Sequence, residues 1–177
     1  MGKYLFKSER LGFRNWTAED LDPMTAINAD PAVMRFFPGT QAKATTKDFI
    51  DRKSAEYQSR GYTYFAVELL DSGKLIGFIG LSYQDFESAW TPFVDIGWRL
   101  NKVYWGRGLA TEGANRVLEF GFTDIKLEEI YAIAPAKNLP SINVMKKIGM
   151  QKIGDFDHPK LQDYPELMNC VVYQIRR

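Results

Sequence analysis

The sequence predicts an α/β (α+β) fold with a mixed sheet, in a single domain that spans residues 1–177. The predicted elements run strand, helices, three strands, helix, strand, helix and two strands, which is not the strict alternation of a doubly wound sheet. The length of 177 residues is typical of one domain, and no polar linker or internal repeat divides it. The composition, 45% hydrophobic and 25% charged, is that of a globular protein.

The N-terminal third is predicted to hold one strand and three helices. Residues 8–16 alternate apolar and polar side chains, as a half-buried strand does. Residues 17–27 begin with a threonine cap and an acidic first turn, which favours a helix. An Asp-Pro pair at residues 30–31 predicts a second short helix. Residues 45–61 predict a third helix, which ends at its glycine.

The middle of the chain predicts three strands and a helix. Residues 62–70 and 74–83 are rich in strand-forming side chains and flank D-S-G, a hairpin turn signal. Residues 93–100 predict the next strand. From Gly108, apolar side chains recur on one face at helical spacing and polar ones face outward. This helix is therefore expected to pack against a sheet.

The C-terminal third predicts a strand at residues 128–136, a helix at 139–149 and two strands at 150–156 and 169–175. Cys170, the only cysteine, lies in the last of these strands. Reactive thiols favour electropositive, partly exposed settings, so we expect this thiol to be buried rather than catalytic. A single cysteine forms no intrachain disulfide or cysteine cluster, and no metal site is predicted.

Charge and hydropathy argue against several classes of partner. The formal net charge of +1 gives no general attraction to nucleic acid or to an anionic membrane. No window approaches the roughly 18 apolar residues of a membrane span. The N-terminus lacks the apolar core of a signal peptide. A cytoplasmic protein is the resulting expectation.

The stretch Y-W-G-R-G-L-A-T-E-G, residues 104–113, joins a strand to a helix and predicts an anion site. Its glycines let main-chain N–H groups be approached closely, and the helix N-terminus adds about half a positive charge, which suits a diphosphate. It is not a P-loop, because G-x-x-x-x-G-K-[ST] is absent. It is not a dinucleotide fingerprint either, because Thr111 stands at the third glycine position.

Two alternatives remain open for this stretch. The glycines can serve only the backbone geometry of a tight turn. Arg107 can fold over a bound anion or stand as a solvated surface arginine, and we hold these two interpretations equal.

Residues 105–110, W-G-R-G-L-A, resemble the acetyl-CoA signature Q/R-x-x-G-x-G/A of the GNAT superfamily of N-acetyltransferases. The wider run D-I-G-W-R-L-N-K-V-Y-W-G-R-G-L-A-T-E-G is similar to its ribosomal-protein N-acetyltransferase-like (RimJ/RimL-like) branch. A second block, N-L-P-S-I-N-V-M-K-K-I-G-M, matches N-x-x-S-x-x-V-x-x-K-x-G-[FM], and the likeness spans nearly the whole chain. Trp105 departs from the superfamily's usual Gln or Arg, and Lys102 from a frequent proline.

The resemblance implies a mostly antiparallel sheet of about six to seven strands, splayed between the fourth and fifth, with helices on both faces. Those two strands are residues 93–100 and 128–136, and Pro135 is expected to end their pairing. The implied cofactor is acetyl-CoA, its pantetheine arm lying in the gap like an extra strand. The implied cofactor-binding residues are Trp98, Leu100, Trp105, Gly106, Arg107, Gly108, Leu109, Ala110, Thr111, Asn138 and Ser141.

Main-chain groups near Trp98 and Leu100 would bind the pantetheine amides, and the N–H groups of residues 106–111 would bind the pyrophosphate. Asn138 and Ser141 would bind the pantetheine or phosphate region. As an alternative, both are only the cap of the helix that they begin.

For catalysis, the resemblance makes Asp95 the first candidate for a general base, because some relatives carry a glutamate near this position. An ion pair with Arg99 is the equally weighted alternative. Glu68 and His158 are weaker candidates. The tyrosine that acts as general acid in many relatives is replaced by Met145, which leaves Ser141 or water to protonate the leaving thiolate. Phe36 and Phe37 are candidate substrate contacts, of which at most one should face inward on a short helix.

The resemblance therefore implies transfer of an acetyl group from acetyl-CoA to a primary amine of a protein N-terminus or a small molecule. Its alternative is a non-catalytic acyl-CoA-binding sensor, which the missing tyrosine favours. Acetyl-CoA and an amine acceptor are the expected partners, and nucleic acid and membrane are not. An exposed terminal strand would allow a homodimer.

Overall fold

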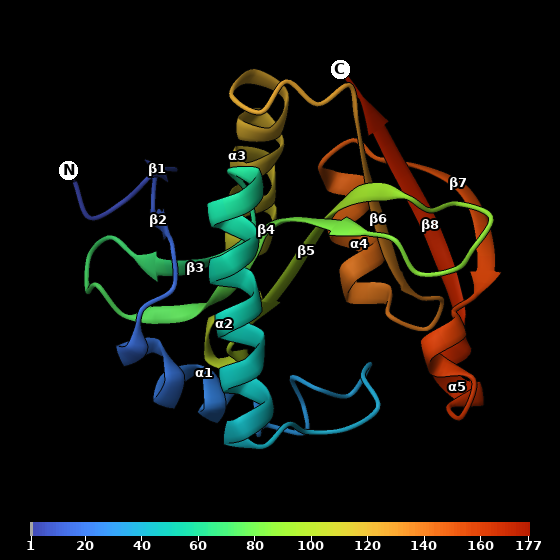
Figure 1. Ribbon diagram of the computed structural model, residues 1–177, viewed down its shortest axis with the longest axis horizontal. Helices are drawn as coiled ribbons and strands as arrows, with labels where there is room; N and C mark the ends of the chain where they lie inside the picture. The colour runs from blue at the N-terminus through green and yellow to red at the C-terminus, as the bar shows by residue number, and fades with distance from the viewer. Residues whose placement is uncertain (1) are drawn as a thin grey trace.

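Within residues 2–177, which the computed structural model describes, eight strands form one sheet in the order β1-β2-β3-β4-β5-β6-β8-β7 (Figure 1). Neighbouring strands are antiparallel except for the parallel pair β5 and β6. The strands are β1 (Phe6–Lys7), β2 (Leu11–Arg14), β3 (Tyr64–Leu69), β4 (Leu75–Gln84), β5 (Phe93–Leu100), β6 (Glu129–Pro135), β7 (Gln151–Asp157) and β8 (Asn169–Arg176).

The mostly antiparallel mixed sheet is thus confirmed, with one strand more than expected. The additional strand is β1, which has two residues and pairs with β2. Two residues are too few to show the alternation by which a strand is recognised in a sequence. The other seven strands correspond to the predicted ones, with ends that differ by a few residues.

The described residues also hold five α-helices and three short 3₁₀ helices. The α-helices are α1 (Leu21–Asn28), α2 (Lys43–Arg60), α3 (Leu109–Thr123), α4 (Leu139–Lys147) and α5 (Pro165–Met168). The 3₁₀ helices are η1 (Ala18–Asp20), η2 (Lys102–Tyr104) and η3 (Pro159–Leu161). The α2 helix ends at Gly61, which has a left-handed φ of 76°, as predicted from the glycine.

The predicted short helix after residue 30 is wrong. Residues 31–36 form consecutive turns instead. The carboxylate of Asp30 accepts a hydrogen bond from the Ala32 N–H at 2.9 Å and pairs with Lys102 at 2.7 Å. A side chain that bonds its own backbone two residues later favours a turn over a continuing helix.

Helices cover both faces of the sheet, as predicted. Neighbouring side chains of a strand point to opposite faces. Phe78 of β4 packs with Ile50 of α2 and Met24 of α1, whereas its neighbour Ile79 packs in the cluster that contains Val117 of α3. Figure 1 shows α2 in front of the sheet and α3 behind it.

The sheet splays between β5 and β6, the fourth and fifth strands predicted from the sequence. The strands β4 and β5 pair from Gly77↔Leu100 to Gln84↔Phe93. In the described chain β5 and β6 share a single register pair, Asp95↔Tyr131. The two strands therefore separate beyond Asp95, well before Pro135. Pro135 itself still pairs with β8, opposite Cys170.

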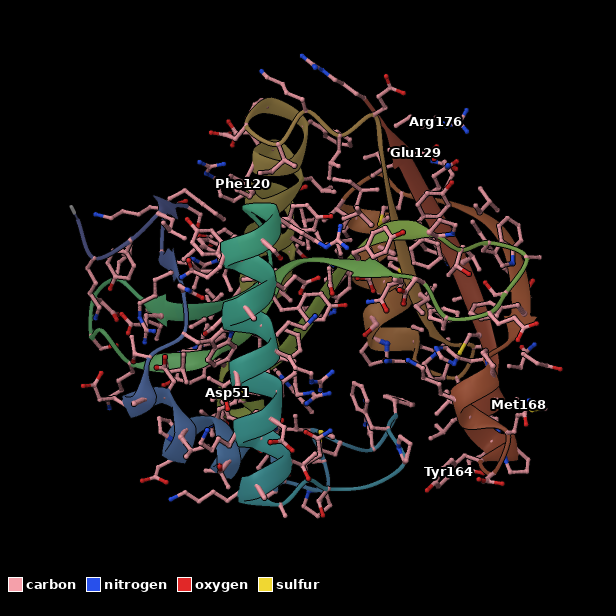
Figure 2. The ribbon with its side chains drawn as sticks, viewed as in Figure 1. Asp51, Phe120, Glu129, Tyr164, Met168 and Arg176 are labelled. Carbon is pink, nitrogen blue, oxygen red and sulfur yellow. The ribbon has the colours of Figure 1, made fainter. Side chains whose placement is uncertain are left out.

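The far half of the sheet is held together by β6, β7 and β8. Glu129 of β6 lies opposite Arg176 of β8, and their side chains form an ion pair of 3.3 Å near the C-terminus (Figure 2). Cys170 is buried, as predicted, and burial raises the pKa of its thiol to about 12. Among the described helices, none is long and apolar enough to cross a membrane.

Candidate functional site

A cavity of about 340 Å³ opens where β5 ends and α3 begins. Its walls come from β5, the turn before α3, the start of α4 and the loop between α1 and α2. The lining residues are Ala32, Val33, Arg35, Phe36, Phe37, Trp98, Arg99, Leu100, Tyr104, Trp105, Gly106, Gly108, Leu109, Ala110, Thr111, Asn138, Pro140, Ser141, Val144 and Lys147. Ten of the eleven predicted cofactor-binding residues are among them, and Arg107 is the exception.

The turn before α3 needs glycine at two positions. Gly106 has φ 73° and Gly108 has φ 77°, a left-handed conformation that disfavours residues with a side chain. The Gly108 carbonyl accepts the N–H of Glu112 at 3.0 Å, so the N–H groups of Leu109, Ala110 and Thr111 precede the first bonded turn. These donors open into the cavity at the positive end of the helix dipole.

Trp105 and Arg107 occupy different surroundings. The Trp105 side chain lines the cavity, is 43% exposed, and donates from Nε1 to the Leu100 carbonyl at 2.9 Å. Arg107 is exposed, and its guanidinium lies 5.8 Å from the centre of the Tyr104 ring. The Arg107 side chain therefore lies on the surface beside the turn, and both interpretations of its role stay predictions.

The edge of β5 that faces the gap presents main-chain hydrogen-bonding groups. The N–H of Asn101 donates to the Ile76 carbonyl at 2.8 Å, which fixes the alternation of bonds between β4 and β5. By that alternation, Arg99 and Gly97 bond to β4, whereas Trp98 and Leu100 direct their main-chain groups toward the gap. The two residues predicted to bind pantetheine are thus the two whose backbone faces the splay.

The start of α4 adds Asn138 and Ser141 to the cavity. The Oδ1 of Asn138 accepts the Ser141 N–H at 3.2 Å, so the expected cap exists. In residues 2–177, the amide nitrogen of Asn138 and the hydroxyl of Ser141 have no hydrogen-bond partner. Capping and ligand binding are therefore compatible here. Met145, one turn later, is buried in the core.

Asp95 is buried below the open part of the splay and does not line the cavity. The side chain is 5% exposed and accepts hydrogen bonds from the Tyr64 hydroxyl, at 2.7 and 2.9 Å, and from Gln84 Nε2 at 3.2 Å. Burial raises the pKa of Asp95 to about 6, and these hydrogen bonds oppose part of the rise. The carboxylate is therefore ionised at neutral pH yet protonates readily.

The alternative ion pair between Asp95 and Arg99 is wrong. Arg99 Nη1 donates instead to Asn28 Oδ1 at 2.7 Å. Four residues of strand separate the two α-carbons by roughly 13 Å, and Arg99 extends away toward α1.

Tyr64, which does not line the cavity, is the hydrogen-bond partner of Asp95 that sequence reasoning missed. A Cβ added at Gly97 would lie 2.9 Å from the Tyr64 hydroxyl, so this hydroxyl rests directly on β5 in its splayed part. Burial raises the pKa of Tyr64 well above its ordinary value, which keeps the hydroxyl protonated. A glycine inside a strand often marks such a close approach, and Gly97 was the available signal.

The two weaker candidates for the general base, Glu68 and His158, do not line the cavity. Glu68 is buried away from the cavity, where Tyr4, Lys3 and Arg14 bind its carboxylate. His158 stacks on Phe86 with ring centres 4.5 Å apart, and its Nδ1 accepts the Lys160 N–H, which supports the packing interpretation.

Phe36 and Phe37 both line the cavity. The expectation that only one of them faces inward is therefore wrong. It assumed helical geometry, and these residues lie in a turn.

Comparisons with known proteins identify relatives of this chain in sequence and in fold. A family model described as acetyltransferase (GNAT) domain matches residues 10–151. An uncharacterised N-acetyltransferase of Bacillus subtilis (strain 168), YnaD, is 33% identical over 150 residues, 84% of each chain. A GNAT-family acetyltransferase structure from Bacillus anthracis superposes with a TM-score of 0.81 at 29% identity, covering 96% of both chains.

The fold is also shared with an enzyme solved with coenzyme A. The structure of RimL, a ribosomal L7/L12 α-N-protein acetyltransferase, in complex with coenzyme A has a TM-score of 0.76 at 12% identity, covering 96% of this chain and 95% of that one. The family match covers most of the sequence and the fold agrees with it. The chain therefore belongs to the GNAT acetyltransferase family.

Proposed function

We propose that this protein transfers an acetyl group from acetyl-CoA to a primary amine of a small molecule or a protein N-terminus, by direct attack of the amine on the thioester. The observation that carries the proposal is that two sets of free main-chain donors open into one cavity. One set is the first turn of α3 and the other is the gap-facing edge of β5.

The residues present fit coenzyme A. Leu109, Ala110 and Thr111 offer N–H groups for the diphosphate at a helix N-terminus. The main-chain groups of Trp98 and the N–H of Leu100 are offered to the amides of the pantetheine arm, as an added strand would receive them, whereas the Leu100 carbonyl already accepts the Trp105 Nε1–H. The free amide of Asn138 and hydroxyl of Ser141 lie on the opposite wall.

Bound acetyl-CoA supplies a thioester carbonyl carbon, to which the amine nitrogen bonds while the carbon–sulfur bond breaks. An amine attacks only in its neutral form, so the site must accept a proton. We assign that role to Asp95, which acts through the Tyr64 hydroxyl. This hydroxyl donates its proton to the carboxylate at 2.7 Å and takes one from the amine side. Water protonates the departing sulfur, either directly or through the Ser141 hydroxyl, which gives its proton to the sulfur as it takes one from solvent.

The alternative is a non-catalytic acyl-CoA sensor, and two observations favour it. Met145 stands where many relatives carry the acid, and Asp95 is enclosed by Tyr64 and Gln84 rather than open to the cavity. The thiolate is a tolerable leaving group, so loss of a dedicated acid lowers the rate without abolishing the reaction. We therefore favour the enzyme.

The decisive assay follows thiol release from acetyl-CoA in the presence of a panel of primary amines. The proposal predicts amine-dependent release that Asp95→Asn slows by about 100-fold, with the acidic limb of the pH profile near pH 6 lost. Coenzyme A binding without turnover of any amine would instead identify a sensor. An unaltered pH profile in Asp95→Asn would remove Asp95 from the role of base.

A further inference from the structure

Arg99 has an unusual environment for a cation. Its Nη1 donates to Asn28 Oδ1 at 2.7 Å, and Asn28 is itself fixed by donating to Thr46 at 3.0 Å. The guanidinium carbon lies 4.2 Å from the centre of the Phe37 ring and 5.4 Å from that of Phe78. Asn28 of α1, itself held by α2, and the loop between the two helices therefore hold this side chain in one orientation at the cavity wall.

No carboxylate balances this charge. Among residues 2–177, Arg99 takes part in none of the ion pairs, and the bond to Asn28 is its sole side-chain hydrogen bond. The Nε is buried without a partner. Burial lowers the pKa of Arg99 to about 10, so the group stays cationic at neutral pH. A buried, unpaired donor on a cation is costly, and no protein carboxylate offsets the charge of Arg99.

The cavity around Arg99 contains no negative group to compete. Its charged lining residues are Arg35, Arg99 and Lys147, and no aspartate or glutamate of the described chain lines it. A polycationic acceptor would meet only like charges here. An acceptor that carries an anionic group would find Arg99 already oriented.

The Arg99 side chain lies on the opposite face of β5 from the side chains of Trp98 and Leu100. Side chains alternate along a strand, so Arg99 shares the α1 and α2 face with Asp95, whereas Trp98 and Leu100 point to the face of α3. The diphosphate already has donors at the start of α3. The charge of Arg99 therefore lies on the face of β5 that also holds Tyr64 and Asp95, the two residues assigned above to proton transfer.

We propose that Arg99 binds a carboxylate of the acceptor, so that the substrate is a carboxylate-bearing amine and not a polyamine. The inference deepens the acetyl transfer proposed above and rests on it. A planar guanidinium matches a carboxylate well and forms charge-assisted hydrogen bonds to it. Asn28 and the ring of Phe37 hold the guanidinium in place for that contact.

Arg116 provides a matched control. It too stacks on an aromatic ring, 4.8 Å from the centre of Phe6, and has a buried Nη1 without a hydrogen-bond partner. Unlike Arg99, it lies outside the cavity and has Glu119 at 3.4 Å. Replacing Arg116 removes a stacked arginine without touching the site.

The test compares acceptors in pairs that differ only in a carboxylate, with acetyl-CoA as donor. The probes are glycine, β-alanine, 4-aminobutyrate, 6-aminohexanoate and glycyl-glutamate. Each is compared, as acceptor, with the derivative in which every carboxylate is replaced by a carboxamide. The probes differ in the distance between amine and carboxylate, because only a probe whose distance fits the site can reach Arg99 and the thioester together. We expect at least one carboxylate to exceed its carboxamide in kcat/KM by about tenfold or more, and Arg99→Gln to lower that value roughly 10- to 100-fold.

Three further results complete the expectation. Arg99→Gln lowers the slower carboxamide reaction far less than the carboxylate reaction, Arg99→Lys retains part of the preference, and Arg116→Gln retains all of it. Equal rates for both members of every pair would overturn the proposal. So would a loss in Arg99→Gln that is the same for both members, or an increase in the KM for acetyl-CoA with every acceptor, because the charge would then serve the coenzyme.

A binding measurement separates this proposal from the proposed reaction. The N-acetylated form of each probe is titrated calorimetrically into protein saturated with coenzyme A. If no amine is acetylated, the proposed acetyl transfer is refuted. The calorimetric titration then still decides whether Arg99 binds a carboxylate. Carboxylate binding that Arg99→Gln abolishes supports the site, and absence of binding to the wild type overturns it.

Discussion

Asp95 is a buried carboxylate stabilised by two uncharged neighbours, Tyr64 and Gln84. The sequence identified Asp95 by its place on the strand, but not these partners, because they come from β3 and β4 and meet it only through register. Its expected partner Arg99 is bound elsewhere, by Asn28 of α1. Contacts between residues distant in the chain depend on how elements pack, which local patterns do not encode.

The free energy of unfolding should depend on pH, because burial disfavours the ionised form of Asp95. Its pKa is about 6 in the folded chain and about 4 when unfolded. The folded state thus binds more protons between pH 4 and 6, and wild-type stability falls as pH rises through that window. Asp95→Asn does not show this loss. The free energy of unfolding of the variant minus that of the wild type should therefore increase by roughly 2 to 3 kcal/mol from pH 4 to pH 7.

Denaturant unfolding at several pH values measures this difference. Asp163→Asn, at an exposed position, is the control and should show no such change. A pH-independent difference in Asp95→Asn would mean that the carboxyl titrates normally in the fold.

Tyr64→Phe should slow acetyl transfer by about 10- to 100-fold, because it removes the hydroxyl between Asp95 and the amine. It also removes a hydrogen bond that lowers the pKa of Asp95. The acidic limb of the pH–rate profile should therefore move to higher pH. Tyr57→Phe, which alters a tyrosine packed on the core, should change neither. A slower rate with an unmoved acidic limb would argue against the proton route.

At the scale of elements, the site depends on how β5 and α3 meet. The sequence predicted both elements and the glycine turn between them, because glycine, helical periodicity and strand alternation are local signals. It did not predict β1 or α5, which are too short for a period, nor the turns at residues 31–36. Those turns bring both Phe36 and Phe37 to the cavity.

Amide hydrogen exchange should reveal the alternation along β5. The N–H groups of Trp98 and Leu100 face the gap and should exchange at least about tenfold more slowly once coenzyme A is bound. Those of Gly97 and Arg99 already bond to β4 and should change little. NMR resolves the four amides individually. Protection of the second pair alone would place the pantetheine arm elsewhere.

Gly108→Val should weaken coenzyme A binding by tenfold or more. The position has φ 77°, and a left-handed backbone costs other residues roughly 1 to 2 kcal/mol. The added side chain also crowds the N–H groups that follow. Gly39→Val is the control, because its added Cβ meets no atom within 4 Å and it does not line the cavity. Unchanged affinity in Gly108→Val would show that the diphosphate lies elsewhere.

At the scale of the whole molecule, the candidate site lies where the sheet divides into two halves. The half formed by β1 to β5 and the half formed by β6 to β8 meet at a single described register pair, Asp95↔Tyr131 (Figure 1). The position of the splay followed from the resemblance to a family, because no local pattern states which strands separate. The set of side chains that line the cavity was beyond it, since the loop between α1 and α2, β5, the turn before α3 and the start of α4 each contribute to its walls.

The central claim is that this division of the sheet binds coenzyme A, and calorimetric titration of coenzyme A into the folded protein tests it most directly. We expect saturable binding at one site per chain, weakened by Gly108→Val and retained by Gly39→Val. Absence of heat, together with no change in thermal stability at millimolar coenzyme, would contradict it.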